Sequence, residues 1–348
     1  MINKNRSEKE KKIIKTKVNM KKQEGIKKVY IIASIVFLSL GMLYALNVGS
    51  VSMSFGDMIK GLCSGVTEGN IGVIKEIRMP RVFSAVLIGG NLAVAGVLLQ
   101  AVIRNPLADP YITGISSGAS FVTVIIMMFF PAINMARPLF GFMGGSVSCA
   151  IVYVFAFKKE LSPIRIVLVG AAVNALFGGI TSLLTTSSGI GGSAVSRWLT
   201  GSLATVKVMD LKILFIYTII GMTGAIMVTR SCNILSLGRK NARSLGINPD
   251  LHMILITAVA VFLSSVSTSI GGIISFIGLV VPHMCRIIIG SEHKYLIPFS
   301  AVMGGALLLT ADTLGRILMK PVEIPVGIIM SVIGAPFFLY LLRRSDLR

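Results

Sequence analysis

Charged side chains are scarce in this chain. Asp, Glu, Lys and Arg make up 14% of its 348 residues, whereas 54% are hydrophobic. With a mean hydropathy of +0.83, this composition excludes an ordinary soluble domain and indicates a membrane protein. Segments that alternate apolar and polar residues are lacking as well, which argues against an outer-membrane barrel. The apolar runs are solid, so membrane-crossing helices are expected.

Residues that hold metals or carry out catalysis are also few. The three histidines are far apart, and the four cysteines have neither metal nor disulfide spacing. No Gly-x-x-x-x-Gly-Lys-Ser/Thr loop and no His-Glu-x-x-His or Cys-x-x-Cys pattern occurs. A Gly-x-Ser-x-Gly match at 114–118 follows no predicted strand, so a hydrolase nucleophile is not expected there. The sequence therefore predicts no catalytic residue, no metal site and no cofactor bound by this chain.

The basic residues are concentrated at the start of the chain. Of 34 Lys and Arg, 11 precede Val29, and the formal net charge is +20. Such a cluster beside the first apolar run is typical of an orientation signal lying on anionic lipid, and no nucleic-acid partner is expected. Residues 1–28 are predicted to be a basic cytoplasmic segment. No Ala-x-Ala site follows the first run, so an uncleaved first span is expected.

Residues 29–348 are predicted to form one membrane domain, an all-α bundle of about ten transmembrane helices. Placing the basic head in the cytoplasm puts 24 Lys and Arg inside and 10 outside, as the positive-inside rule requires. An even number of spans also places the C-terminus in the cytoplasm, so a multi-pass protein of the cell membrane is expected. The predicted spans are 29–47, 82–103, 112–131, 138–157, 164–186, 211–229, 251–269, 272–290, 297–315 and 324–342.

Two stretches depart from a plain bundle. Prolines and glycines interrupt the helical pattern at 105–118, which predicts a broken or re-entrant segment, with an ordinary cytoplasmic turn as the alternative. Residues 187–209 contain the lone tryptophan, Trp198, which fits a short helix at the outer interface or merely an anchored loop. Elsewhere, pairs such as Gly89-Gly90 and Gly304-Gly305 predict close helix packing.

Ionisable residues within the predicted spans are nearly absent. Asp312 lies near the outer end of the ninth span with Arg316 four positions later, so an ion pair is expected there rather than a coupling carboxylate. Energy for transport would then come from another subunit. An ion-coupled secondary carrier stays the main alternative from another class.

The inner loop at about 232–247 is unusual for a connector. Its pattern predicts two short helices, with Gly238 between them and Gly246 ending the second. Apolar residues give it a hydrophobic side although it should lie in the cytosol. This pattern favours docking of a soluble partner, and packing on its own bundle is the alternative.

Several motifs occur along the chain, including Arg-Met-Pro-Arg at 78–81, Asn-Pro-Leu-Ala-Asp-Pro at 105–110, Gly-Ile-Ser-Ser-Gly-Ala at 114–119 and Ala-Asp-Thr-Leu-Gly-Arg at 311–316. Together they closely resemble the FecCD-type permease family of iron-siderophore, haem and cobalamin importers. The resemblance covers residues 29–343 in order, and only the long basic head departs from it.

The resemblance implies a type II ABC importer permease bundle. The expected partners are a second permease copy or a paralogue, two ATP-binding-cassette ATPase subunits that use ATP and Mg, an extracytoplasmic substrate-binding protein and membrane lipid. The expected function is import of an iron chelate, with a ferric siderophore first and haem or cobalamin as alternatives. The chain itself would be a transport subunit and not an enzyme.

The resemblance also implies roles for individual residues. The set expected to couple to the ATPase is Ile234, Leu235, Leu237, Gly238, Arg243, Leu245 and Gly246. Outward-facing arginines expected to dock the binding protein, or else to contact lipid headgroups, are Arg78, Arg81 and Arg316. The cytoplasmic gate is expected at Asn105, Leu107 and Ser162, although Ser162 equally fits a structural turn. Asn174 and Met330 are expected to line the path or simply to pack.

Overall fold

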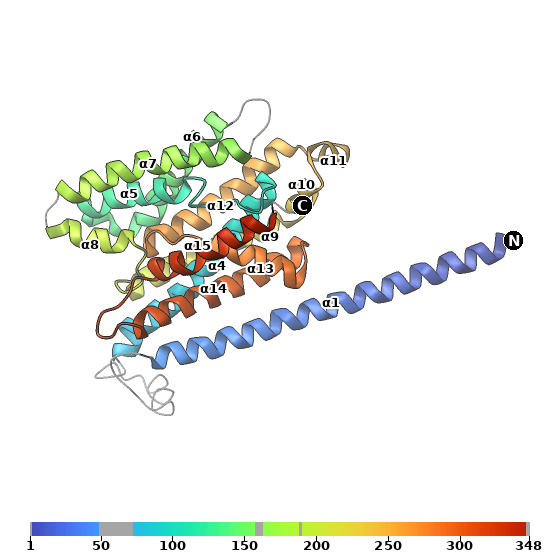
Figure 1. The fold of residues 1–348 in the computed structure, drawn as a ribbon, viewed down its shortest axis with the longest axis horizontal. Coiled ribbons are helices and arrows are strands. Elements are labelled where there is room, and N and C mark those ends of the chain that lie inside the picture. Colours follow the sequence, from blue (N-terminus) through green and yellow to red (C-terminus); the bar gives the residue numbers. More distant parts are fainter. Residues whose placement is uncertain (1, 49–71, 157–162, 188–189, 346–348) are drawn as a thin grey trace.

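The computed structural model describes residues 2–48, 72–156, 163–187 and 190–345, and every regular element in these ranges is a helix (Figure 1). Seven long helices are apolar enough to cross a membrane, and three shorter apolar helices accompany them. Each of the ten falls on one of the ten predicted segments, so the predicted fold is confirmed. Ser162, one of the expected gate residues, lies outside the described ranges.

The helices have the following bounds. The long ones are α1 (Ile2–Asn47), α4 (Met79–Ile103), α6 (Arg137–Ala156), α7 (Pro163–Ser187), α9 (Val208–Met227), α12 (Pro249–Gly271) and α14 (His293–Ile317). The shorter apolar ones are α5 (Ile115–Phe129), α13 (Ile277–Ile289) and α15 (Val326–Ser345). Connecting elements are η1 (Ile74–Arg78), η2 (Pro131–Ala136), α8 (Ile190–Leu199), α10 (Thr229–Ser236) and α11 (Arg239–Ser244).

Helix α4 forms the centre of the bundle. It packs against α14, α12, α13 and α9, and most of its residues are buried. Two of these contacts bring backbones together, because a Cβ atom at Gly96 would overlap the Gly278 carbonyl and one at Gly89 would overlap the Gly304 carbonyl. Without a hydrophobic effect between helices in lipid, such close approach supplies the packing energy. The close packing predicted for Gly89 and Gly304 is therefore confirmed.

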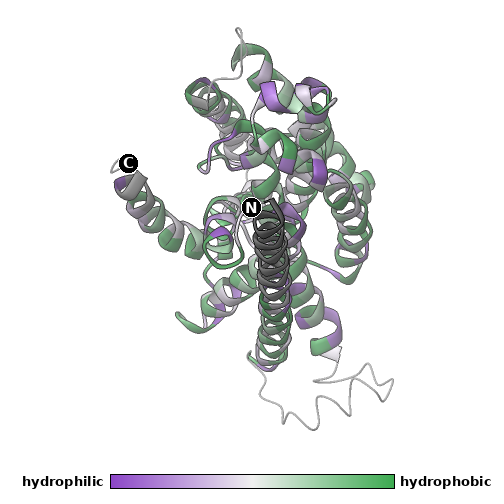
Figure 2. Ribbon diagram, turned by 90° about the vertical axis from the view of Figure 1, so that its right-hand side faces the viewer, coloured by the Kyte–Doolittle hydropathy of each residue, from purple (hydrophilic) through white to green (hydrophobic). Residues whose placement is uncertain are grey.

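Helix α1 lies at the edge of the bundle. It packs along α14, and its first half extends beyond the other helices (Figure 1). Many large apolar side chains on α1, α7, α9 and α15 are exposed, and Figure 2 shows that hydrophobic residues make up much of the helices. In a membrane protein, a surface of exposed apolar side chains faces lipid.

The chain between α4 and α5 is irregular, as predicted. Arg104 and Gly114 bound it with left-handed backbone, at φ values of 51° and 81°. Side chains satisfy part of its backbone: Asn105 Oδ1 accepts from the Leu107 amide at 2.9 Å, and Asp109 Oδ1 accepts from the Tyr111 amide at 2.8 Å. Asp109 is buried, so protein rather than lipid surrounds the centre of this break.

The short helix predicted within 187–209 is present as α8. Trp198 is buried within the protein, and its Nε1 donates to the Ile270 carbonyl at 3.2 Å. The indole therefore ties α8 to the end of α12. The position of α8 at the outer interface stays a prediction.

Candidate functional site

The segment 232–247, called the coupling segment below, contains two short helices that meet at a glycine. Gly238 joins α10 to α11 with φ 99°, and Gly246 follows α11 with φ 78°. Both angles lie in the left-handed region that glycine adopts without steric cost. The two helices predicted from the glycine spacing are therefore confirmed.

Apolar side chains of the coupling segment point in two directions. Leu235 and Ala242 are buried against the bundle and Ile234 is half-buried, whereas Leu237 and Leu245 are each 59% exposed. Both packing on the bundle and a free apolar surface are thus present. Two exposed leucines on one short polar connector form a surface suited to a protein partner.

Basic side chains of the coupling segment pair with the start of α12. Arg239 forms an ion pair with Asp250, and Arg243 lies 3.7 Å from the other oxygen of the same carboxylate. Asn248 caps α12 by accepting from the amides of Asp250 and Leu251. These contacts hold the coupling segment against α12.

A second polar cluster occupies the opposite end of α14. Arg81 Nε donates to both oxygens of Asp312, at 3.1 and 3.0 Å, and its Nη1 lies 2.7 Å from Glu323 Oε2. Arg316 Nε is 3.4 Å from Asp312 Oδ2, which confirms the predicted i,i+4 pair. One buried carboxylate therefore serves two guanidinium groups.

Arg316 and a third arginine, Arg78, hold the end of α1. Arg316 Nη1 donates to the carbonyls of Ala45 and Val48 at 3.1 and 3.0 Å. Arg78 Nη1 donates to the carbonyl of Leu46 at 3.0 Å. The last carbonyls of a helix lack partners within it and carry partial negative charge, so cationic donors stabilise this end.

The resemblance implies that three arginines face outward and dock the binding protein. Arg78, Arg81 and Arg316 are all buried, with partners inside the chain. Their docking role stays a prediction. The sequence could not show their present partners, because main-chain carbonyls of α1 have no sequence signature.

Two of the expected gate residues directly follow the end of α4, which approaches the coupling segment. Asn105 and Leu107 are half-buried in the irregular chain after α4. The neighbouring Arg104 has its Nη1 only 3.3 Å from where a Cβ atom on Gly238 would stand. The end of α4 and the coupling segment are therefore in direct proximity.

A polar hollow lies between α5, α7 and α8. Asn174 lines it, donates to the Tyr111 carbonyl at 2.9 Å and accepts from the Ser117 hydroxyl. No atom lies within 4 Å of a Cβ position at Gly178, so the α7 side is open. Met330, the other expected path residue, is fully buried in the core. The lining is Tyr111, Ser117, Ser120, Asn174, Gly178, Thr181, Ser182, Thr185, Ser196, Leu199 and Ile273.

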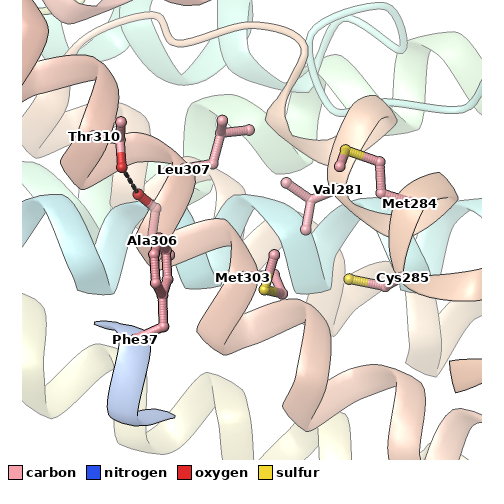
Figure 3. A pocket seen from close by; sticks show the side chains of 8 residues that line it. All are labelled: Phe37, Val281, Met284, Cys285, Met303, Ala306, Leu307 and Thr310. Carbon is pink, nitrogen blue, oxygen red and sulfur yellow. Dashed lines mark hydrogen bonds between the residues drawn. The ribbon is translucent and has the colours of Figure 1, made fainter. Parts of the chain in front are cut away.

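A second hollow differs in chemistry. It lies where Phe37 of α1 meets α13 and α14, and its walls are apolar (Figure 3). The Thr310 hydroxyl in this wall already donates to the Ala306 carbonyl at 2.8 Å. Nothing in the wall would bind a charged chelate, so the polar hollow is the better candidate for a path. Within the described ranges, no three His, Cys, Asp or Glu residues gather as a metal site would require.

Comparison with known proteins places these features in a family. The model of the FecCD transport family matches residues 37–344. The chain belongs to this family. A FecCD relative in Bacillus subtilis, the Fe(3+)-citrate import system permease protein YfmD, is 37% identical over 91% of this chain and 94% of its own length. The "probable heme-iron transport system permease protein IsdF" of Staphylococcus aureus is 34% identical, over 92% and 97%.

Solved structures agree with this membership. A chain from a metal-chelate type ABC transporter in an inward-facing conformation superposes with a TM-score of 0.77 at 28% identity, covering 90% of this chain and 98% of that one. PsaBC from Streptococcus pneumoniae shares the fold with a TM-score of 0.57 at 16% identity, covering 82% and 95%. The FecCD chain therefore has the architecture of an ABC importer permease.

Proposed function

We propose that this chain is the permease subunit of an ATP-binding-cassette importer that carries an iron chelate across the cell membrane. The observation that carries the proposal is the exposed leucine pair Leu237 and Leu245 in a FecCD permease. Burying one such side chain contributes about 1.5–3 kcal/mol, so an ATPase groove that covers both gains substantial binding energy. ATP and Mg would be used by the separate ATPase subunits and not by this chain.

Supporting evidence for the orientation comes from the ends of the chain. In Figure 1 the C-terminal end of α15 lies toward the same end of the bundle as α10 and α11, and the start of α1 projects beyond that end. A basic head favours the cytoplasm. Both termini and the coupling segment are therefore proposed to be cytoplasmic, with the ATPase docking there. Ile234, Leu235, Gly238, Arg243 and Gly246 would shape or support that contact.

The assembly we propose contains two permeases, either identical or paralogous, two ATPases and an extracytoplasmic substrate-binding protein. The binding protein would approach the end with Arg78, Arg81 and Arg316, where Glu323 is half-exposed. Charge complementarity would set its register. Lipid would surround the bundle.

For the path, we propose the polar hollow at Asn174, with a cytoplasmic gate at Asn105, Leu107 and Ser162. Hydroxyl and amide groups can exchange hydrogen bonds with an oxygen-rich chelate as it passes. Met330, being buried, would act through packing. The cargo is proposed to be a ferric chelate such as a siderophore or ferric citrate, with haem or cobalamin as the alternatives, because the names of both relatives concern iron.

One observation favours a second candidate, an ion-coupled secondary carrier. Asp312 is a buried carboxylate in a membrane-crossing helix, and such groups often couple ions. Its two arginine partners favour a structural role instead. The test below separates the two candidates.

Proteoliposomes with this permease, its ATPase and the binding protein outside test the proposal. We expect ATP-dependent uptake of a ferric siderophore or ferric citrate, with haem and cobalamin compared in parallel. Leu237→Asp should abolish uptake, whereas Ser244→Asp, which adds the same charge at another exposed position of the segment, should retain most of it. Uptake that needs no ATPase and follows an ion gradient would refute the proposal.

A further inference from the structure

The first turn of α14 is hydrogen bonded by a residue of the coupling segment. His293 opens α14, and both its main-chain N–H and its ring Nδ1 lie against Asn233 Oδ1 of α10, at 3.0 and 2.7 Å. The residue in the cap position, Glu292, makes no side-chain cap bond. Asn233 therefore takes the place of a cap, although it stands 60 positions earlier in the chain.

The protonation of this link follows from its geometry. A main-chain N–H can only donate, so the Asn233 atom that it meets must be the amide oxygen. The Nδ1 of His293 must then carry its hydrogen and donate to that same oxygen. His293 is buried, and its Nε2 has no partner among the described residues. The amide oxygen thus receives two donors from one helix end.

A parallel link joins α10 to the start of α12. Ser231 Oγ lies 2.9 Å from His252 Nδ1, and Ser231 is buried. Helix α10 also packs against α4. Helix α10, which contains the start of the coupling segment, is consequently fastened by side chains to the first turns of two membrane-crossing helices.

Helix α14 extends from this link to the cluster at its other end. Its 25 residues correspond to about 37 Å at 1.5 Å per residue. At the far end, Asp312 and Arg316 pair, and Arg316 holds the last turn of α1. A displacement of the first turn of α14 therefore reaches the opposite side of the bundle if the helix moves as a rod.

We propose that Asn233 is a positioning residue that makes α14 move together with the coupling segment, so that motion imposed by the ATPase reaches the far end of the bundle. This inference rests on the proposed function, ATP-driven import. It differs from the ATPase contact itself, because Asn233 is half-buried and faces α14 rather than the partner.

The test compares two substitutions at one position in the assembled transporter. Asn233→Asp keeps an oxygen acceptor for both donors, whereas Asn233→Leu removes it at similar size. Cargo uptake and ATP hydrolysis are measured in the same proteoliposomes. We expect Asn233→Leu to bind the ATPase and hydrolyse ATP, but to carry at least about fivefold less cargo per ATP, the factor that one lost hydrogen bond corresponds to. Asn233→Asp should restore the parent ratio.

Two further variants make the result decisive. Asn233→Ser also removes the link, because its hydroxyl is too short to reach α14. It should show the same loss of cargo per ATP as Asn233→Leu, and it replaces that variant in the test if the leucine variant folds poorly. Asn241→Ala is the control, because Asn241 is exposed and its amide bonds only within its own turn, to the Leu237 carbonyl at 2.8 Å.

The outcomes separate this inference from the proposed function. An unchanged ratio of cargo to ATP in Asn233→Leu and Asn233→Ser would overturn the inference. A loss of ATPase binding in these variants that is as large as their loss of uptake would overturn it as well. Persistence of uptake in Leu237→Asp, or without any ATPase, would instead contradict the proposed function.

Discussion

The Asp312 carboxylate should be the most sensitive single site for stability. Its side chain is 2% exposed and pairs with Arg81 and Arg316, which are nearly as buried. Asp312→Asn keeps the size of the side chain but removes its charge, which leaves two buried guanidinium groups with Glu323 as the one remaining carboxylate partner in the described part of the chain. Breaking a buried ion pair in this way costs about 3–5 kcal/mol. We expect the free energy of unfolding to fall by that amount.

The assay is equilibrium unfolding in mixed micelles, in which the helical circular dichroism is followed as denaturing detergent is added. Glu323→Gln is the matched control, because it removes the other carboxylate that pairs with Arg81. The Glu323 side chain is 47% exposed, so water screens its pair and its loss should cost at most about 1 kcal/mol.

A change below about 1 kcal/mol for Asp312→Asn would refute this reasoning. It would mean that the two guanidinium groups find other acceptors or water at this end of the bundle. They would then be available to an approaching binding protein, as the family resemblance suggested. A loss of stability of about 3–5 kcal/mol would instead show that the ion pairs around Asp312 hold α1, α4 and α14 together.

Two further predictions concern packing and pH. Gly96→Ala should lower the thermal midpoint in detergent by overpacking against the Gly278 carbonyl, at a cost of about 1–3 kcal/mol, whereas Gly179→Ala meets open space and should have little effect. Burial raises the pKa of Asp109, in the connection between α4 and α5, to about 6, although main-chain N–H donors oppose the shift. The folded state therefore holds this proton more tightly than the unfolded state, so stability should fall as pH rises from about 4 to 6 and stay level above. Thermal midpoints measured from pH 4 to 8 should lose this slope in Asp109→Asn, and an identical slope would contradict the assignment.

The course of the membrane helices could be predicted from the sequence because hydropathy sums over some 20 residues and tolerates local errors. The ends of the helices were predicted less accurately. The predicted span 272–290 begins five residues before α13, since Gly272 and Phe276 both have left-handed backbone there. A positive φ at a phenylalanine cannot be read from composition.

Side-chain partners were predictable only when they were near in sequence. Asp312 and Arg316 are four positions apart, and their pair was expected. Arg81 and Asp312 stand 231 positions apart, and Asn233 and His293 stand 60 apart. No local pattern links such residues, because the bundle alone brings them together.

The coupling segment shows the same limit in a subtler form. Its apolar residues predicted a hydrophobic side. The sequence did not decide whether that side docks a partner or packs on the bundle of the same chain. On each side of the turn at Gly238 one apolar residue packs inward and one is exposed: Leu235 and Ala242 are buried, whereas Leu237 and Leu245 face outward. The orientation of each side chain depends on the angle between α10 and α11, which the sequence does not specify.

The distribution of polar groups along α14 suggests how a permease can combine tight packing with movement. Polar links occur at its two ends, through His293 and Arg316, where their desolvation is least costly. Between them, α14 meets α4 at Gly304, where backbone touches backbone. A backbone contact has no rotamers that could absorb a displacement, so a shift of one end must move α14 as a whole or carry α4 with it. The helix pair therefore favours rigid shifts over local deformation, which is the type of motion that alternating access requires.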